Sequence, residues 1–409
     1  MRIAVINWNR RLEGGVETYL DKVIPALHLS GHKIAFCHEI DQPANRGSIR
    51  IPEGAPSWCT ARLGIRQTAA ALREWQPDLI YGHNIASLEL ERQTIKIAPG
   101  VFFAHGYQGT CISGSKTFTS PMPHPCARRF GWQCLVHFYP RRCGGLNPIT
   151  MAALYRTQAA RLALIKQYRL VLTNSEHMRA EYIRNGIPPD RVFKLQYCVL
   201  PLGSKAGDDP SFLKPRTLSK NEWRLAFAGR MEALKGGSVL LNAVRLLRAR
   251  TDRSLHLTMA GEGPYRSDWE AVASRLQAGM RSVNIKFTGW LDDAQLAALF
   301  DESDLFVMPS LWPEPFGIVG VQAGLRGLPT AAFDVGGIPT WLVNGVSGHL
   351  APGDPPTAEG LANAIFNCLS DRDHYLELRK GALATAGSFK IESHVADLTR
   401  LLEAAIHLK

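Results

Sequence analysis

The chain has 409 residues, of which 45% are hydrophobic and 20% charged, and its formal net charge is +11. The length exceeds what one hydrophobic core usually serves and the composition excludes a disordered chain, so we expect two domains. The positive charge favours an anionic ligand or an acidic membrane surface. Nucleic acid is disfavoured, because the basic residues are scattered and no RNA-binding motif is found.

Targeting signals do not stand out along the chain. The N-terminal MRIAVINWNRR has too short an apolar run for a signal peptide. The segment LALIKQYRLVLT is interrupted by Lys166 and Arg169, so it is not expected to span a membrane. We therefore expect a cytoplasmic protein. In that compartment reduced thiols or metal ligands explain the eight cysteines better than a disulfide framework does.

The first half of the chain alternates short β-rich apolar runs with amphipathic helical patterns. The pattern predicts strands over 2–7, 33–39, 78–83, 101–105, 170–175 and 192–198, and helices over 16–29, 66–75, 148–167 and 176–186. The segment 200–220 is rich in Gly, Pro and Asp and is expected to be a linker.

The alternation begins again after this linker. Strands are predicted over 224–229, 255–261, 284–290 and 304–309, and helices over 237–250, 268–279 and 294–303. Nearly continuous apolar strands separated by helices indicate parallel sheets covered on both faces. The prediction is an α/β protein with two doubly wound, Rossmann-like domains facing across a cleft, with ligands at the carboxyl ends of the strands.

The expected domains are residues 1–204, with an insertion at 106–148, and residues 205–385. Residues 386–409 form a helix that either caps its own domain or crosses back to the first.

Two glycine-containing turns follow predicted strands. Gly14 and Gly15 open the first helix, where they either bring backbone N–H groups to an anion or serve only as a tight turn. GGVE is not the G-x-G-x-x-G fingerprint, so a nicotinamide cofactor is disfavoured. In FAGRMEALKGG (227–237), Arg230 and Lys235 suit a diphosphate, the alternative being solvated loop charges.

A third turn, PEPFG (313–317), leads from a predicted strand into a helix. Glu314 and the backbone N–H groups of Phe316, Gly317 and Ile318 suit the hydroxyls of a polyol. The alternative is an acid that only complements the helix dipole, which contributes about 0.3–1 kcal/mol.

The ordered set of GGVE, GRMEALKGG, AGEGP (260–264), FTGWL (287–291), PEPFG and DVGGIPTWLVNGVSGHL (334–350) resembles the GT4-type retaining glycosyltransferases of the GT-B fold. The resemblance also includes His83, His105 and NSEHMRAEYIRNGI in the first half. It implies transfer of a hexose from a UDP- or GDP-sugar to a glycan or lipid-linked acceptor, in cell-surface polysaccharide or glycoconjugate synthesis.

The resemblance also assigns roles to residues. It implies that Arg230 and Lys235 grip the donor diphosphate, and that Glu314 with the amides of Phe316 and Gly317 holds the transferred sugar. The remaining assignments place Gly289, Trp290 and Leu291 at the base, Gly14 and Gly15 at the donor phosphate, and His105 near the donor sugar, where the alternative is a structural histidine. No catalytic metal is required for this chemistry, because cations and helix N-termini stabilise the leaving diphosphate.

One position departs from the family pattern of two glutamates. The second acid, which accepts hydrogen bonds from the ribose, is replaced by Gln322. An amide binds more weakly, by roughly 1–2 kcal/mol, so we expect weaker donor binding in an active enzyme. The alternatives are a catalytically silent GT-B scaffold, or a nucleotide-sugar epimerase, which would need additional acid/base side chains.

The insertion 106–148 lacks hydrophobic periodicity and contains Cys111, Cys126, Cys134 and Cys143. A structural zinc ion is one explanation, although no Cys-x-x-Cys pair is present; scattered thiols or a disulfide are the alternatives. The insertion also mixes arginines with aromatic residues, which suits either a lipid-linked acceptor with peripheral contact to an anionic membrane or a solvated loop.

Overall fold

The computed structural model describes residues 1–41, 47–202 and 218–408. Contacts divide the chain into two units. The first contains residues 1–115, 127–198 and 389–409, and the second contains residues 116–126 and 199–388. The predicted boundary at residue 204 and most of the predicted linker fall within 203–217, outside the described residues.

The first unit is built on a parallel sheet of seven strands in the order β3-β2-β1-β4-β5-β8-β9. Its strands are β1 (Arg2–Asn9), β2 (Lys33–Ile40), β3 (Ser57–Cys59), β4 (Leu79–Gly82), β5 (Gly100–Ala104), β8 (Leu170–Thr173) and β9 (Val192–Lys194). The central strands are almost entirely buried, as expected for a sheet covered on both faces. Such strands carry continuous apolar runs, which is why sequence alone locates them.

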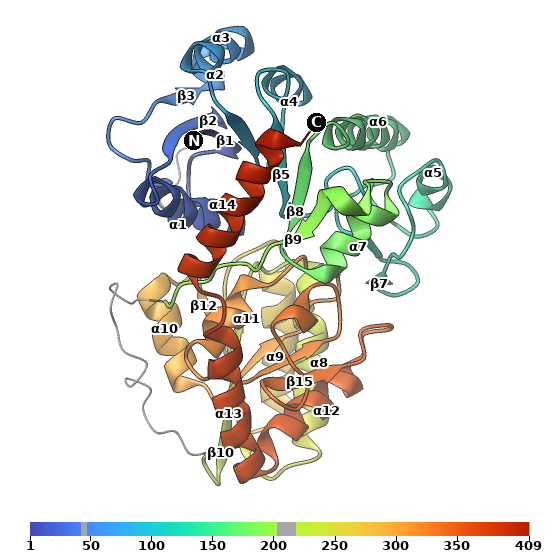
Figure 1. Cartoon of the computed structure of the whole chain (residues 1–409). Coiled ribbons are helices and arrows are strands. Elements are labelled where there is room, and N and C mark those ends of the chain that lie inside the picture. Colours follow the sequence, from blue (N-terminus) through green and yellow to red (C-terminus); the bar gives the residue numbers. More distant parts are fainter. Residues whose placement is uncertain (42–46, 203–217, 409) are drawn as a thin grey trace. The chain divides into compact units, whose positions relative to one another are not determined.

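Helices follow most of these strands. They are α1 (Gly15–Leu29), α2 (Thr60–Leu63), α3 (Ile65–Trp75), α4 (Leu88–Thr94), α5 (Gln133–Phe138), α6 (Pro148–Ile165), α7 (Glu176–Arg184) and α14 (Ile391–His407), with a 3-10 turn at Pro189–Arg191. Figure 1 shows α14, in red, beside α1, in blue, although almost the whole sequence separates them. His394, on α14, accordingly bonds to Tyr19 on α1, at 2.8 Å from Nε2 to the hydroxyl oxygen.

The second unit contains a parallel sheet of six strands in the order β12-β11-β10-β13-β14-β15. These are β10 (Glu222–Ala228), β11 (Ser254–Ala260), β12 (Val283–Gly289), β13 (Leu305–Met308), β14 (Thr330–Phe333) and β15 (Gly348–Ala351). Counted from β10, this is the 3-2-1-4-5-6 order of a Rossmann sheet. A two-stranded ladder of β6 (Thr117–Phe118) and β7 (His124–Pro125) belongs to the same unit.

The helices of the second unit are α8 (Gly237–Arg248), α9 (Arg266–Gly279), α10 (Asp293–Glu302), α11 (Ile318–Gly324), α12 (Ala358–Leu369) and α13 (Arg372–Ala386), with 3-10 turns at Ala233–Lys235 and Ile338–Thr340. The prediction of two doubly wound parallel sheets is confirmed. In each sheet the strand order reverses beside the first strand, between β1 and β4 and between β10 and β13, which is where open α/β sheets bind ligands.

Candidate active site

Two loops meet where the strand order of the second sheet reverses. One loop follows β10 and the other follows β13, and the backbone N–H of Leu311 donates to the carbonyl oxygen of Leu234 at 2.8 Å. Gly236 has a φ of 75° and lies so close to the other loop that a Cβ would overlap the carbonyl oxygen of Pro309. A glycine is therefore needed here on two counts, conformation and space.

This close approach places Glu314 beside Lys235. The carboxylate of Glu314 is buried, and its Oε1 accepts hydrogen bonds from Lys235 Nζ at 2.5 Å, Ser310 Oγ at 2.7 Å and Trp312 Nε1 at 2.8 Å. These bonds fix the carboxylate in one orientation. Among the described residues these bonds all end on Oε1, so the lone pairs of Oε2 can accept hydrogen bonds from a ligand.

Lys235 retains partial access to solvent, with 19% of its side chain exposed. Its ammonium group lies 5.3 Å from the centre of the Trp312 ring, a distance at which a cation is attracted to the face of an indole. The charge of Lys235 is thus held beside the two loops and partly exposed to solvent, where an anionic ligand can reach it.

Arg230 is not brought to the same partner. Its guanidinium pairs with Glu232 at 2.9 Å and 71% of the side chain is exposed. The predicted pairing of Arg230 and Lys235 on one diphosphate stays a prediction.

The PEPFG turn ends in a second constrained glycine. Gly317 precedes α11 with a φ of 92°, and the indole N–H of Trp341 donates to the carbonyl oxygen of Phe316 at 2.6 Å. The backbone N–H of Gly337 donates to the carbonyl oxygen of Glu314, also at 2.6 Å. Ile318 is the first residue of α11, and Gln322 lies on this helix, partly buried.

The residues predicted to contact the base follow β12. Gly289 has a φ of 76°, and its carbonyl oxygen accepts from the backbone N–H of Gly261 at 2.8 Å. Trp290 is half exposed and Leu291 is partly buried. The structure therefore places this segment at the same edge of the sheet as Lys235, because both follow parallel strands.

In the first unit, Gly14 is the N-cap of α1 and Gly15 its first residue. Sequence reasoning missed the buried polar side chains beside them. Asn7, near the end of β1, donates to Glu17 Oε1 at 3.1 Å, and burial raises the pKa of the Glu17 carboxyl above its usual value. A single acid inside a helix gives no sequence signal of its burial.

His105 lies just after β5, and its Nε2 lies 2.9 Å from Nδ1 of His83, which follows β4. Burial, with a contribution from the nearby His394, lowers the pKa of His105 to about 3, and burial also depresses the pKa of His83. Both imidazoles are therefore neutral at physiological pH. His394 also belongs to this group and comes from the last helix, a neighbour that no local pattern indicates.

The four insertion cysteines lie in different surroundings. Cys134 and Cys143 pack against the apolar cluster of Ile112, Phe130 and Phe138, while Cys126 belongs to the second unit. The described residues contain one group of at least three potential metal ligands whose ligand atoms all lie within 4.8 Å of one another. None of the four insertion cysteines belongs to this group. The structure does not bring the four thiols together, and the zinc site in the insertion stays a prediction.

Comparisons with known proteins cover both units. The family "Glycosyltransferase Family 4" matches residues 13–194, and the family "Glycosyl transferases group 1" matches residues 222–371. This chain belongs to the group 1, GT4-type glycosyltransferases. As a member of that family it is an enzyme that uses a nucleotide sugar.

The glycosyltransferase is 24% identical to a glycogen synthase of Mycobacterium tuberculosis over 91% of this chain and 86% of that protein. Its fold matches a solved structure of Anabaena Alr3699/HepE in complex with UDP and glucose, with a TM-score of 0.65, 18% identity and coverage of 98% and 99% of the two chains. It also matches the lipopolysaccharide outer core galactosyltransferase WaaB, with a TM-score of 0.66, 13% identity and 99% coverage of both chains. These likenesses confirm the predicted GT-B fold.

In the part of the chain that the structure describes, no helix combines the length and the apolar character needed to cross a bilayer.

Proposed function

We propose that this glycosyltransferase moves a hexose from a UDP- or GDP-sugar to a glycan or lipid-linked acceptor with retention of anomeric configuration. The observation that carries the proposal is the Glu314 carboxylate held by Lys235, Ser310 and Trp312 where the strand order of the second sheet reverses. A buried carboxylate whose second oxygen accepts no hydrogen bond from the described residues suits sugar hydroxyls, and an adjacent ammonium group suits a diphosphate.

The chemistry follows from this arrangement. As the bond to the leaving diphosphate breaks, negative charge builds on the phosphate oxygens while the sugar becomes oxocarbenium-like. Lys235 stabilises the charge on the phosphate, with Arg230 recruited from its exposed partner Glu232. Glu314 Oε2 accepts a hydrogen bond from a hydroxyl of the transferred sugar and fixes its orientation.

In this proposal a phosphate oxygen of the donor takes the proton of the acceptor hydroxyl, so no side-chain base and no catalytic metal are needed. His105 acts as a neutral hydrogen-bonding group, since its depressed pKa keeps it from carrying a proton at neutral pH. Backbone groups complete the proposed donor site. They belong to Gly14, Gly15, Gly289, Trp290 and Leu291, together with the amides of Phe316, Gly317 and Ile318.

A lipid-linked or cell-surface acceptor is supported by two observations. The solved relative WaaB is described as a lipopolysaccharide outer core galactosyltransferase. The segment 128–149 of this chain exposes large apolar side chains, with exposed fractions of 66% for Trp132 and 78% for Ile149, beside the exposed Arg129 and Arg142. Mixed apolar and cationic side chains suit the surface of an anionic membrane.

The donor is identified by thermal shift of the purified chain with UDP-, GDP- and ADP-sugars, followed by a transfer assay with the sugar that binds. Stabilisation grows as RT ln(1 + [L]/Kd), so one nucleotide should stand out. Binding without transfer or hydrolysis would favour the silent scaffold, and interconversion of the free nucleotide sugar would favour the epimerase.

Membrane contact is tested separately by co-sedimentation with vesicles of phosphatidylglycerol or of phosphatidylcholine alone. Binding to the anionic vesicles should weaken in Trp132→Asp and at high salt. Equal binding to both vesicle types would argue against the electrostatic contribution.

A further inference from the structure

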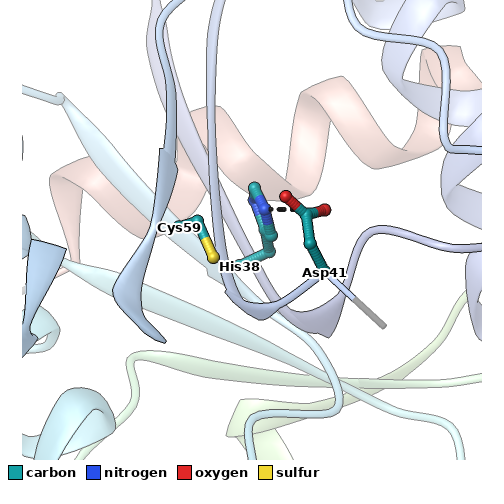
Figure 2. Close-up of side chains that lie close together, drawn as sticks. All are labelled: His38, Asp41 and Cys59. Atoms are coloured by element: carbon teal, nitrogen blue, oxygen red, sulfur yellow. Dashed lines mark ion pairs between the residues drawn. The ribbon is translucent and has the colours of Figure 1, made fainter. Parts of the chain in front are cut away.

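A group of three potential metal ligands lies at the carboxyl ends of β2 and β3. His38 and Cys59 are paired residues in the parallel register of these strands, and Asp41 follows the end of β2. One ligand atom from each residue lies within 4.8 Å of those of the other two. Figure 2 shows the imidazole of His38 between the sulfur of Cys59 and the carboxylate of Asp41.

In the part of the chain that the structure describes, the buried imidazole of His38 has no good hydrogen-bond partner. The residue is 2% exposed, and neither ring nitrogen has a hydrogen bond of acceptable geometry among the described residues. Its Nε2 lies 3.3 Å from Asp41 Oδ1, and its ring stacks on Phe36 with the centroids 5.4 Å apart. Buried polar groups are normally satisfied, so a nitrogen lone pair left over in this position calls for a ligand.

The two other side chains are also held in place. Asp41 directs Oδ2 to Arg62 at 3.1 Å, which leaves Oδ1 toward His38. Cys59 is 8% exposed, and its sulfur lies 3.7 Å from the carbonyl oxygen of Glu39, a weak interaction that a metal bond would easily replace. The arginine on Oδ2 is the kind of outer contact that orients a ligating carboxylate.

We propose that His38, Asp41 and Cys59 bind a Zn²⁺ ion, with water as the fourth ligand. Imidazole nitrogen, carboxylate oxygen and thiolate sulfur together suit zinc, which accepts all three, better than Mg²⁺ or Ca²⁺, which prefer oxygen alone. Tetrahedral bonds of about 2.0–2.3 Å place ligand atoms about 3.3–3.7 Å apart, so the spacing of 3.3 Å between His38 and Asp41 needs little adjustment.

Binding balances charge and protons. The thiol of Cys59 loses its proton to solvent as the sulfur–zinc bond forms, and the thiolate and carboxylate together neutralise the dication. Arg62 remains paired with the outer carboxylate oxygen. The ion ties the end of β2 to the end of β3, independently of sugar transfer and of the cysteines of the insertion.

The test uses the purified full-length chain, stripped of metal and titrated with Co²⁺ and then Zn²⁺. One equivalent of Co²⁺ should give a thiolate-to-cobalt charge-transfer band in the near ultraviolet, and Zn²⁺ should displace it. Cys59→Ser should lose the band, and His38→Asn and Asp41→Asn should each weaken Zn²⁺ binding at least about tenfold, because loss of an outer partner alone already costs 10–100-fold.

Two controls keep the result specific. Cys37→Ser changes the preceding residue of β2, whose sulfur faces Thr60 Oγ1 at 3.9 Å, and should leave the band and the stoichiometry unchanged. A variant with Cys111, Cys126, Cys134 and Cys143 replaced by Ser should still bind one equivalent. Circular dichroism of each metal-free variant confirms folding.

The proposal is overturned if the wild-type chain takes up no Co²⁺ or Zn²⁺ at micromolar concentrations, or if Cys59→Ser keeps the charge-transfer band. It is also overturned if the insertion variant, and not Cys59→Ser, abolishes binding, because the metal would then belong to the insertion.

Discussion

Glu314 receives three hydrogen bonds on one carboxylate oxygen, and among those three donors only Lys235 carries a charge. Loss of this ammonium group removes both the stabilisation of the leaving phosphate and the charge that balances Glu314. Lys235→Ala should therefore lower kcat/KM by about 10²–10³-fold, the usual cost of removing a donor that stabilises transition-state charge.

The measurement is steady-state kinetics with the donor identified by thermal shift. Lys286→Ala, which removes an exposed lysine from β12, is the matched control and should retain wild-type activity. Equal activity of Lys235→Ala and the control would remove Lys235 from the proposed donor site.

Gln322 lies on α11, the helix that follows Glu314 in the chain. The family pattern has an acid at the position of Gln322. If this amide holds the ribose, Gln322→Glu should tighten nucleotide binding by roughly 1–2 kcal/mol through charge-assisted hydrogen bonds. Isothermal titration with the nucleotide diphosphate measures the change. Gln167→Glu places the same charge on an exposed residue after α6 and should have no effect; an unchanged affinity in Gln322→Glu would reject the ribose role.

At the scale of elements, the buried histidines make the stability of the first unit depend on pH. Burial lowers the pKa of His105 to about 3 and that of His394 to about 4, whereas in the unfolded chain a histidine titrates near 6.5. Between these values the unfolded chain binds protons that the folded chain does not, so stability rises with pH and is lost as the pH falls below about 6.5.

The contribution of His105 should make the free energy of unfolding about 2 kcal/mol lower at pH 5 than at pH 7. Urea denaturation of the full chain at the two pH values measures this difference. His105→Asn should show a shallower pH dependence than the wild type, whereas His407→Asn, at the exposed end of α14, should match the wild type. A free energy of unfolding independent of pH in this range would contradict the depressed pKa values.

Sequence patterns predicted the elements well because buried parallel strands such as β5 and β8 carry unbroken apolar runs. They also predicted that Lys235 and Glu314 each follow a strand. They did not predict the direct bond between them, because it depends on the spatial order β10-β13 and on the close approach of Gly236 to Pro309. Likewise, the pairing of His38 with Cys59 depends on the register of β2 and β3, which neither segment reveals alone.

Over the whole molecule, the last helix completes the first unit. Leu398, Leu402 and Ala405 of α14 are fully buried, and His394 bonds to Tyr19. Leu402→Ala should destabilise the first unit by about 2–5 kcal/mol, the usual cost of truncating a buried leucine. Hydrogen exchange resolved by peptide checks this, since peptides from residues 1–115 should lose protection while those from 222–371 keep it.

Leu408→Ala is the matched control, because Leu408 is 44% exposed and follows the end of the same helix. It should cost less than about 0.5 kcal/mol. Equal effects of the two substitutions, or loss of protection in the second unit instead, would show that α14 does not support the first.

The return of α14 to the first unit has a consequence for biosynthesis. Residues 199–388 must leave the ribosome before α14 can pair with α1, an interval of roughly 10–40 s at ordinary elongation rates. During that time the first unit lacks one helix and its apolar face against α14 is open, whereas every segment of the second unit, residues 116–126 and 199–388, has already been synthesised. We therefore expect the first unit to complete its folding last, and a released chain truncated after residue 388 should be cut by protease in residues 1–115 and 127–198 sooner than in residues 222–388.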